Sequence, residues 1–169
     1  MQLGSLVLMR HAKSSYPIGI ADHDRPLNVR GQRDAAAAGA WFSENQAIWQ
    51  GVSRKVLISS AHRAQQTWAI ASEEFDVDHQ DEPRIYEASV STLISLVDVD
   101  IHNGVDVLLV GHNPGLEELA LFLTQFQITP ARSMAAEKFP TCGIAVLRMR
   151  DNTWSNTSAV FESFIVPRG

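Results

Sequence analysis

Short apolar runs alternate along the chain with longer stretches in which apolar and polar residues are mixed. Three of the runs are mostly apolar and end on polar residues: LVLM at 6–9, KVLISS at 55–60 and DVLLVGH at 106–112. Continuous runs of this length are typical of strands that are buried on both faces. We therefore expect three strands in the interior of a parallel sheet.

Amphipathic stretches follow these runs and predict helices. The first predicted helix begins near Leu27, with Asn28 as its N-cap, and ends before Gly51. Pro114 is expected early in the last of these helices, where proline is tolerated. The later predicted helices cover residues 61–75, 91–98 and from Pro114 to about Phe126.

The remaining segments are shorter or less regular. Residues 14–26 contain Pro, Gly and Asp and predict a loop, whereas PRIYEA at 83–88 predicts a short strand or extended piece. Residues 128–141 show no regular pattern. GIAVLRMR at 143–150 and SAVFESFIV at 158–166 flank an Asp-Asn turn, which predicts a terminal hairpin.

Alternating strands and helices in 169 residues predict one α/β domain over residues 1–169, with a mostly parallel sheet and an antiparallel edge. Ligands of such sheets bind beyond the carboxyl ends of the strands. That rule selects three pairs of residues as a candidate site. They are Arg10-His11, Ser59-Ser60 and His112-Asn113.

Composition narrows the classes of function. The net charge of -5 argues against a general nucleic-acid or membrane binder, although a local basic pocket would attract a phosphorylated ligand. The single cysteine, Cys142, suits a reducing compartment. No segment has the pattern of a secretory leader, and no apolar run approaches a membrane span. We expect a soluble, cytoplasmic protein.

Two arginines and two histidines lie at or just beyond the predicted strand ends: Arg10, His11, Arg63 and His112. The planar guanidinium of arginine matches phosphoryl oxygens, and a neutral imidazole can attack phosphorus directly. Taken singly, Arg63 is more typical of a surface residue, and His11 is as compatible with a hydrogen-bonded structural role. Their joint placement at separate strand ends favours a shared phosphoryl site.

Five segments follow one another along nearly the whole chain: LVLMRHAKS, DRPLNVRGQRDA, LISSAHRAQQTWAIA, VGHNPGLEELA and KFPTCGIAVL. In this order they resemble the histidine phosphatase superfamily, also called the phosphoglycerate mutase-like superfamily, and within it the SixA-type phosphohistidine phosphatases. The resemblance implies a three-layer α/β/α sandwich.

The resemblance also implies roles for individual residues. His11 would be the nucleophile that forms a phosphohistidine intermediate, while Arg10, Arg63 and His112 would bind the phosphoryl group. Members of the superfamily need no metal, and the other histidines show no metal-ligand spacing, so we expect no metal and no cofactor. Ala12 stands where the signature has glycine, and we expect its small methyl group to narrow the site only locally.

An asparagine that many superfamily members carry after the nucleophile is also missing from this chain, where the corresponding stretch is SSYP at 14–17. A phosphate contact is therefore absent or is replaced by Ser14.

Glu87 lies where the superfamily places its general acid, but the glycine- and aromatic-rich segment that usually follows is absent. A surface or helix-capping carboxylate is an equal interpretation of Glu87. Asp22 and Asp24 are weaker acid candidates and are more typical of turn residues. An alkoxide leaving group needs an acid, whereas the imidazole of a phosphohistidine needs less help.

These observations favour a phosphatase for phosphohistidine on a signalling or phosphotransfer protein. The chain has no long insertion that could form a closed lid, and an open pocket suits a phosphorylated side chain projecting from a partner protein. The alternatives are a phosphatase for a small phosphate ester and a phosphate-binding module without catalysis.

Overall fold

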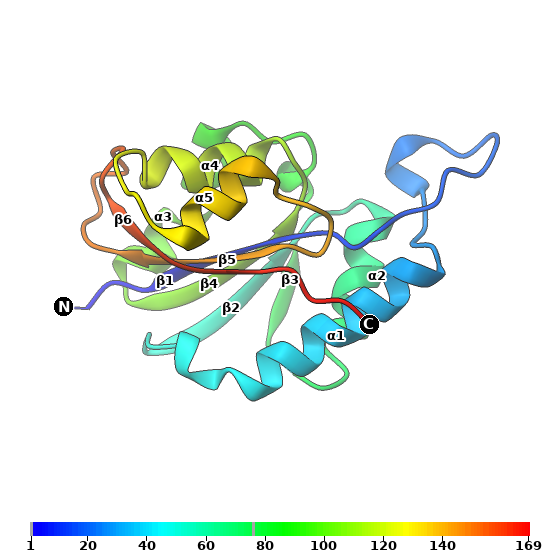
Figure 1. Ribbon diagram of the computed structural model, residues 1–169, viewed down its shortest axis with the longest axis horizontal. Helices are drawn as coiled ribbons and strands as arrows, with labels where there is room; N and C mark the ends of the chain where they lie inside the picture. The colour runs from blue at the N-terminus through cyan, green and yellow to red at the C-terminus, as the bar shows by residue number, and fades with distance from the viewer. Residues whose placement is uncertain (1, 76) are drawn as a thin grey trace.

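The computed structural model describes residues 2–75 and 77–169. Within these residues the chain forms a six-stranded sheet between two layers of helices (Figure 1). The strands are β1 (Ser5–Arg10), β2 (Ser53–Ile58), β3 (His79–Asp81), β4 (Val105–Gly111), β5 (Ile144–Met149) and β6 (Ala159–Ile165).

The strand order across the sheet is β3-β2-β4-β1-β5-β6. Strands β1, β2, β3 and β4 pair in parallel, whereas β5 is antiparallel to both β1 and β6. The predicted mostly parallel sheet, its antiparallel edge and the terminal hairpin are confirmed. Because β1 and β4 are parallel neighbours, Arg10 pairs with Gly111 and the residues that follow both strands emerge together.

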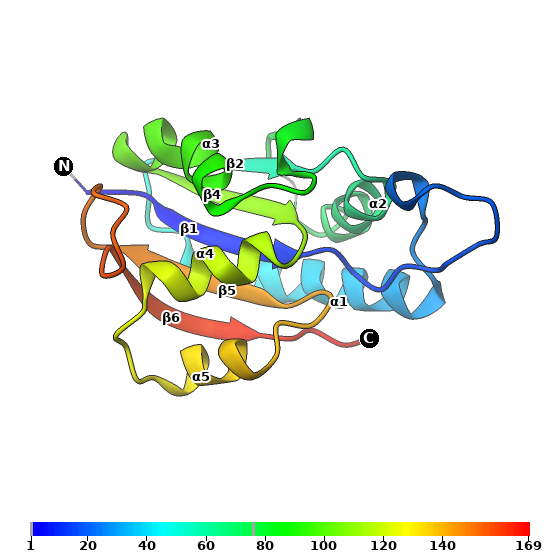
Figure 2. The same cartoon turned by 90° about the horizontal axis from the view of Figure 1, so that it is seen from above.

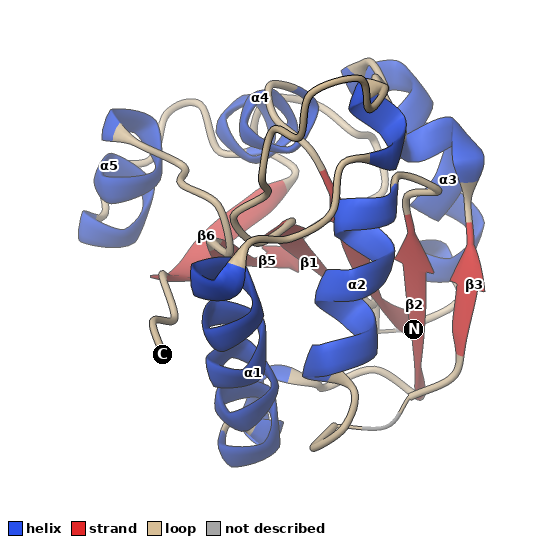
Figure 3. Ribbon diagram, turned by 90° about the vertical axis from the view of Figure 1, so that its right-hand side faces the viewer, coloured by secondary structure: helices blue, strands red, loops and turns tan. Residues whose placement is uncertain are grey.

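Helices cover both faces of the sheet, as a view along it shows (Figure 3). α1 and α2 lie on one face, and α3, α4 and α5 lie on the other. The predicted three-layer α/β/α arrangement is confirmed. The helices are α1 (Val29–Glu44), α2 (His62–Ala71), α3 (Val90–His102), α4 (Gly115–Leu123) and α5 (Pro130–Glu137).

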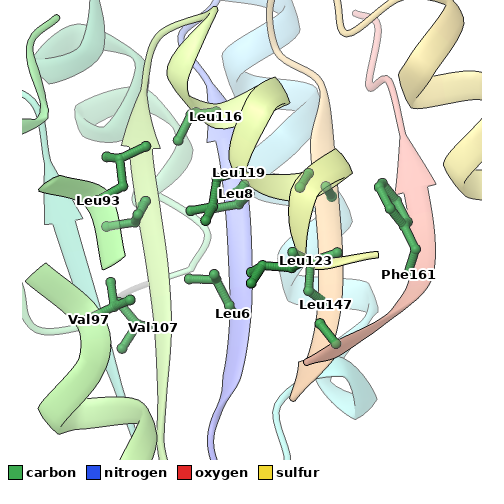
Figure 4. Close-up of a cluster of buried hydrophobic side chains, with 14 of the residues drawn as sticks. Leu6, Leu8, Leu93, Val97, Val107, Leu116, Leu119, Leu123, Leu147 and Phe161 are labelled. Carbon is green, nitrogen blue, oxygen red and sulfur yellow. The ribbon is translucent and has the colours of Figure 1, made fainter. Parts of the chain in front are cut away.

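Side chains of the central strands alternate between two hydrophobic cores, as the two-residue period of a strand requires. Leu6 and Leu8 of β1 point toward α3 and α4, where they pack among other leucines and valines (Figure 4). Val7 and Met9 point to the opposite core, beneath α1 and α2. Full burial of each such side chain contributes about 1.5–3 kcal/mol. Both faces of β1 are therefore anchored just before the candidate site.

The start of α1 is fixed against the segment that leaves β1. Asn28 caps the helix as predicted, since its side chain accepts a hydrogen bond of 2.8 Å from the Gly31 N–H. The Asn28 N–H donates to the Lys13 carbonyl at 3.0 Å. A Cβ atom on Gly31 would lie 2.0 Å from that same carbonyl oxygen, so only glycine allows this contact.

Some predicted boundaries were wrong. α2 ends at Ala71 rather than near Phe75, and α4 ends at Leu123 rather than near Phe126. PRIYEA holds a 3-10 turn over Pro83–Ile85 instead of a strand. The strand of this region, β3, is a short exposed edge strand of polar residues, which carries no hydrophobic signal.

The segment predicted to be irregular contains α5. Its start carries two local signals, a cap and a proline. Thr129 accepts a hydrogen bond from the Arg132 N–H, and Pro130 is the first helical residue. Among residues 2–75 and 77–169, no helix has the length and apolar character needed to cross a bilayer.

Candidate active site

His11 follows the carboxyl end of β1 and is held by backbone contacts on both sides. Its N–H donates to the Gly111 carbonyl at 2.9 Å, and its carbonyl accepts from the Cys142 N–H at 3.0 Å. The next N–H, that of Ala12, donates to Thr67 Oγ1 on α2 at 2.9 Å. Strands β1 and β4, the entry to β5, and helix α2 therefore fix the position of the imidazole.

The hydrogen bonds of the His11 ring define its tautomer. Nδ1 lies 2.7 Å from the Ala12 carbonyl oxygen, and because a carbonyl only accepts, Nδ1 carries the ring hydrogen. Nε2 has the lone pair and accepts from Arg63 Nε–H at 3.3 Å. Burial lowers the pKa of His11 to about 3, so the ring is neutral near pH 7. Nε2 thus carries the lone pair of a buried neutral ring, and that lone pair is directed at Arg63 Nε–H.

Arg63 stands on the first turn of α2, directly beyond β2. Its side chain is only 6% exposed, although it is charged. Besides its contact with His11, it donates from Nη1 to the Asp22 carbonyl at 2.7 Å and from Nη2 to Asp22 Oδ2 at 3.1 Å. The structure confirms that Arg63 lies beside His11.

Arg10 reaches the site from the end of β1. Its Nη1 donates to the Phe139 carbonyl at 2.9 Å, which ties it to the segment between α5 and β5. Burial lowers the pKa of Arg10, but its guanidinium group stays charged near pH 7. Its Nε is buried and has no partner within the described part of the chain.

His112 follows β4 and lies next to His11, with ring centroids 5.2 Å apart. Its Nε2 is 2.7 Å from Ser59 Oγ. The Ala61 N–H donates to that Ser59 oxygen at 3.3 Å, so the hydroxyl hydrogen is available to His112 Nε2. In the tautomer that accepts from the Ser59 hydroxyl, the ring hydrogen sits on His112 Nδ1, which is buried and lacks a partner among the residues described.

Burial, and after it the charge of Arg63, lower the pKa of His112 to about 4. The two histidines are therefore both neutral, but their roles differ. His11 presents a lone pair on Nε2, whereas His112 has a hydrogen on Nδ1 to donate. Together with two guanidinium groups, this donor set suits an oxyanion that is attacked by His11.

A pocket of about 330 Å³ opens beside Arg63 and His112, whereas His11 and Arg10 are not among its lining residues. Its wall includes Arg63 and His112 and extends along the segment between β3 and α3. The lining residues are Asp22, Arg63, Tyr86, Glu87, Ala88, His112, Asn113, Pro114 and Gly115.

Glu87 lies in the wall of this pocket and is exposed. Its backbone has a φ of 56°, a left-handed conformation that is uncommon for a residue other than glycine. The neighbouring Ala88 carbonyl packs against α4, since a Cβ atom on Gly115 would lie 2.6 Å from its oxygen. The position of Glu87 in the pocket wall fits both a general acid and a surface carboxylate. Its role as a general acid stays a prediction.

Ser14 is buried outside the residues that line the pocket. Its Oγ accepts from Arg25 Nη1 at 2.7 Å, and its backbone pairs with Leu27. The hydroxyl therefore anchors Arg25 in this structure, and the phosphate contact expected of Ser14 stays a prediction.

Sequence reasoning missed Tyr86 and the functions of two residues that it had named, Ser59 and Asp22. The strand-end rule selected Ser59 for the candidate site but gave it no partner. Asp22 was a weak candidate for the acid and was considered more typical of a turn, yet its carboxylate contacts Arg63 and accepts from Tyr86 OH at 2.6 Å. No spacing in the sequence predicts that Tyr86 and Asp22 meet, because the contact is made by two loops.

Across residues 2–75 and 77–169, the structure holds no group of three or more His, Cys, Asp or Glu side chains arranged to bind a metal ion.

The fold and the strand ends define an α/β protein in which arginine and histidine side chains gather at the carboxyl end of the parallel strands. The sequence model of the histidine phosphatase superfamily (branch 1) matches residues 6–102, more than half of the chain. The chain belongs to the histidine phosphatase superfamily.

Relatives in sequence are similar over their full length. An uncharacterised protein from Mycobacterium tuberculosis is 41% identical over 165 residues, which cover 95% of this chain and 100% of that protein. An uncharacterised protein from Mycobacterium leprae is 39% identical over 168 residues, which cover 95% of this chain and 100% of that protein.

Solved structures show the same fold. A protein from Nakamurella multipartitia, assigned as a phosphohistidine phosphatase SixA, aligns with a TM-score of 0.81 and 25% identity, covering 99% of this chain and 98% of that one. A protein from Agrobacterium tumefaciens with the same assignment aligns with a TM-score of 0.77 and 27% identity, covering 97% and 99%. The fold is of the phosphoglycerate mutase-like type, as predicted.

Proposed function

We propose that the protein is a metal-independent phosphatase that works through a covalent phosphoryl group on His11 Nε2. The observation that carries this proposal is the state of His11. It is neutral, its lone pair is fixed on Nε2, and that atom lies 3.3 Å from the Nε of a buried arginine. A nucleophile and a phosphate-binding cation therefore meet at one point.

The proposed reaction has two displacements at phosphorus. In the first, the His11 lone pair forms the N–P bond while the bond from phosphorus to the leaving group breaks, and the leaving group takes a proton from solvent or, for an ester, from Glu87. In the second, water forms an O–P bond while the N–P bond breaks and its electron pair returns to His11 Nε2. The phosphate leaves with the protons of that water or releases one to solvent. The Ala12 carbonyl, which accepts from Nδ1, stabilises the positive charge that the phosphorylated ring acquires.

Arg10, Arg63 and His112 bind the phosphoryl oxygens in this proposal. The partnerless buried atoms Arg10 Nε and His112 Nδ1, both noted above for the described part of the chain, support it. A buried donor without a partner is costly, and a bound phosphoryl group would supply acceptors to both.

The favoured substrate is phosphohistidine on a signalling or phosphotransfer protein. Imidazole is a better leaving group than an alkoxide, so such a substrate needs little from Glu87, whose carboxylate is exposed. The two structural relatives assigned as phosphohistidine phosphatases support this choice.

A small phosphate ester is the second candidate substrate. The observation that favours it is that Glu87 lines the same pocket as His112. A phosphate-binding module without turnover is the third possibility, and the complete set of His11, Arg10, Arg63 and His112 argues against it.

A direct comparison of substrates tests the proposal. Purified protein is incubated with a phosphohistidine-carrying protein and with a panel of phosphate monoesters, and release of phosphate is measured for wild type, His11→Ala and Glu87→Gln. We expect faster turnover of phosphohistidine, which is abolished in His11→Ala and reduced less than threefold in Glu87→Gln, about 0.6 kcal/mol. Faster turnover of esters that Glu87→Gln abolishes would establish the second candidate instead.

A further inference from the structure

Asp22 lies on the loop that follows β1 and projects past the carboxyl end of the sheet (Figure 2). Its carboxylate is the meeting point of three side chains from different segments. Arg25 donates from Nε to Oδ1 at 3.0 Å, and its Nη2 forms an ion pair with the same oxygen at 3.0 Å. Arg63 Nη2 and Tyr86 OH reach Oδ2 at 3.1 Å and 2.6 Å. Both oxygens of Asp22 are thus occupied as acceptors.

This arrangement removes Asp22 from the candidates for general acid. The hydrogen bond from Tyr86, followed by those from Arg25 and Arg63, holds the pKa of Asp22 well below its usual range. The same contact with Asp22 raises the pKa of Tyr86. Asp22 therefore has no proton to give near pH 7, and its effect on the site must pass through the groups that it binds.

Asp22 holds one edge of the Arg63 guanidinium through two different groups. Its backbone carbonyl accepts from Nη1 at 2.7 Å, while its carboxylate accepts from Nη2. The remaining nitrogen, Nε, donates to His11 Nε2. Because a guanidinium is planar and rigid, fixing the Nη1 and Nη2 edge also fixes the direction of Nε–H.

Arg25 and Tyr86 hold Asp22 itself in place. Arg25 Nη1 donates to Ser14 Oγ at 2.7 Å and to the Ser15 carbonyl at 3.2 Å, which fastens the loop to the segment leaving the site. Tyr86 approaches from the 3-10 turn after β3, a segment that lines the same pocket as Asp22. Asp22 is more than half exposed, yet it is immobilised by contacts from both sides.

We propose that Asp22 is a positioning residue of the site, which aims Arg63 at the phosphoryl oxygens brought to His11. This inference rests on the proposed function for its role in turnover, but the oxyanion site alone is enough to test it. Asp22 is a specific feature of the loop, because the Asp24 carboxylate in the same turn pairs only with His23 among the described residues, at 3.4 Å.

A simple charge effect would act in the opposite direction. A carboxylate beside an oxyanion site repels the anion, so its removal would tighten anion binding if repulsion dominated. Solvent screens the charge of Asp22, and the paired Arg25 offsets it. We therefore expect the loss of alignment at Arg63 to dominate when Asp22 is removed. Weaker anion binding would then indicate lost alignment, and tighter anion binding would indicate relieved repulsion.

The test measures binding of tungstate, a phosphate analogue, by titration calorimetry at pH 7. Wild type is compared with Asp22→Ala, Asp22→Asn and the matched control Asp24→Asn. We expect Asp22→Ala to weaken tungstate binding about tenfold, about 1.4 kcal/mol. Asp22→Asn should lose less, because an amide oxygen still accepts from Arg63 Nη2, and Asp24→Asn should match wild type. Tighter or unchanged binding in Asp22→Ala would overturn the proposal.

A double-mutant cycle asks whether the effect passes through Arg63. In an Arg63→Lys background, Asp22→Ala should weaken tungstate binding no further, whereas an additive tenfold loss would show that Asp22 acts independently of Arg63 and would also overturn the proposal. If Asp22→Ala does not fold, Tyr86→Phe and Asp22→Asn give the same comparison. Because tungstate binding needs no turnover, failure of the proposed phosphatase activity would be seen separately.

Discussion

At the scale of single residues, the site depends on which nitrogen of each histidine carries a hydrogen. The Ala12 carbonyl places it on Nδ1 of His11, and Ser59 allows it to sit on Nδ1 of His112. With its hydrogen on Nδ1, His11 has a lone pair on Nε2. With its hydrogen on Nδ1, His112 has a donor at that atom. Burial keeps both rings neutral. Two identical side chains thus acquire different chemistry from one hydrogen bond each.

Ser59→Ala tests the role assigned to the serine. Removing the hydroxyl leaves His112 Nε2 without its partner, so the ring is no longer held with its hydrogen on Nδ1. We expect kcat to fall about tenfold with a smaller change in KM, since the contact matters most when charge develops on the phosphoryl oxygens. Steady-state kinetics measure this, with Ser60→Ala as the neighbouring control. An unchanged kcat would show that the tautomer of His112 does not matter.

The depressed pKa of His11 also links stability to pH. In the unfolded chain a histidine has a pKa near 6.5, whereas in the folded chain that of His11 is about 3. Protons therefore bind preferentially to the unfolded state as the pH falls below 6.5. The free energy of unfolding should drop by about 2 kcal/mol from this residue between pH 7.5 and pH 5.

Urea denaturation at a series of pH values measures this drop. His11→Asn, which lacks the titrating ring, should show a shallower loss of stability on acidification than wild type. Equal slopes for the two proteins would mean that His11 is not a buried neutral base.

At the scale of elements, the positions of the catalytic candidates follow from strand ends and helix starts. Asn28 shows how such a local signal supports the site, because its cap fixes α1 against the Lys13 carbonyl, two residues past His11. Strands with continuous apolar runs and capped helices were predictable, since the responsible interactions are local or repeat along the element.

Elements without such signals were not predictable. β3 consists of exposed polar residues and exists because β2 offers it an edge to pair with. The 3-10 turn at Pro83–Ile85 and the contact of Tyr86 with Asp22 depend on loops that meet only in the folded chain. For the same reason the sequence located His11, Arg10, Arg63 and His112 but left Asp22 among turn residues.

Asn28→Ala isolates the contribution of the α1 cap. It removes the side-chain acceptor for the Gly31 N–H, so we expect a loss of about 1 kcal/mol in the free energy of unfolding. Chemical denaturation measures the loss, and Asn28→Ser, which keeps an acceptor, should recover most of it. A larger loss of activity than of stability in Asn28→Ala would show that α1 also positions the catalytic residues.

At the scale of the whole molecule, the sheet brings together side chains that are distant in sequence. β2, β4 and β1 are neighbours and run in parallel, so the residues after them share one end of the sheet. The loop with Asp22 and the segment with Tyr86 and Glu87 border the same pocket. A chain with a net charge of -5 thereby concentrates two arginines at one buried point, where a phosphoryl group is bound in the proposed reaction.

The central claim is that His11 carries the phosphoryl group during turnover. The most direct measurement is to mix the protein with a radiolabelled phosphohistidine-carrying protein, stop the reaction with denaturant at alkaline pH, and map the label by proteolysis. We expect an acid-labile, alkali-stable label on the peptide that contains His11 in wild type and in the His79→Ala control, and none in His11→Ala. Turnover by wild type without any labelled His11, or undiminished turnover by His11→Ala, would contradict the account.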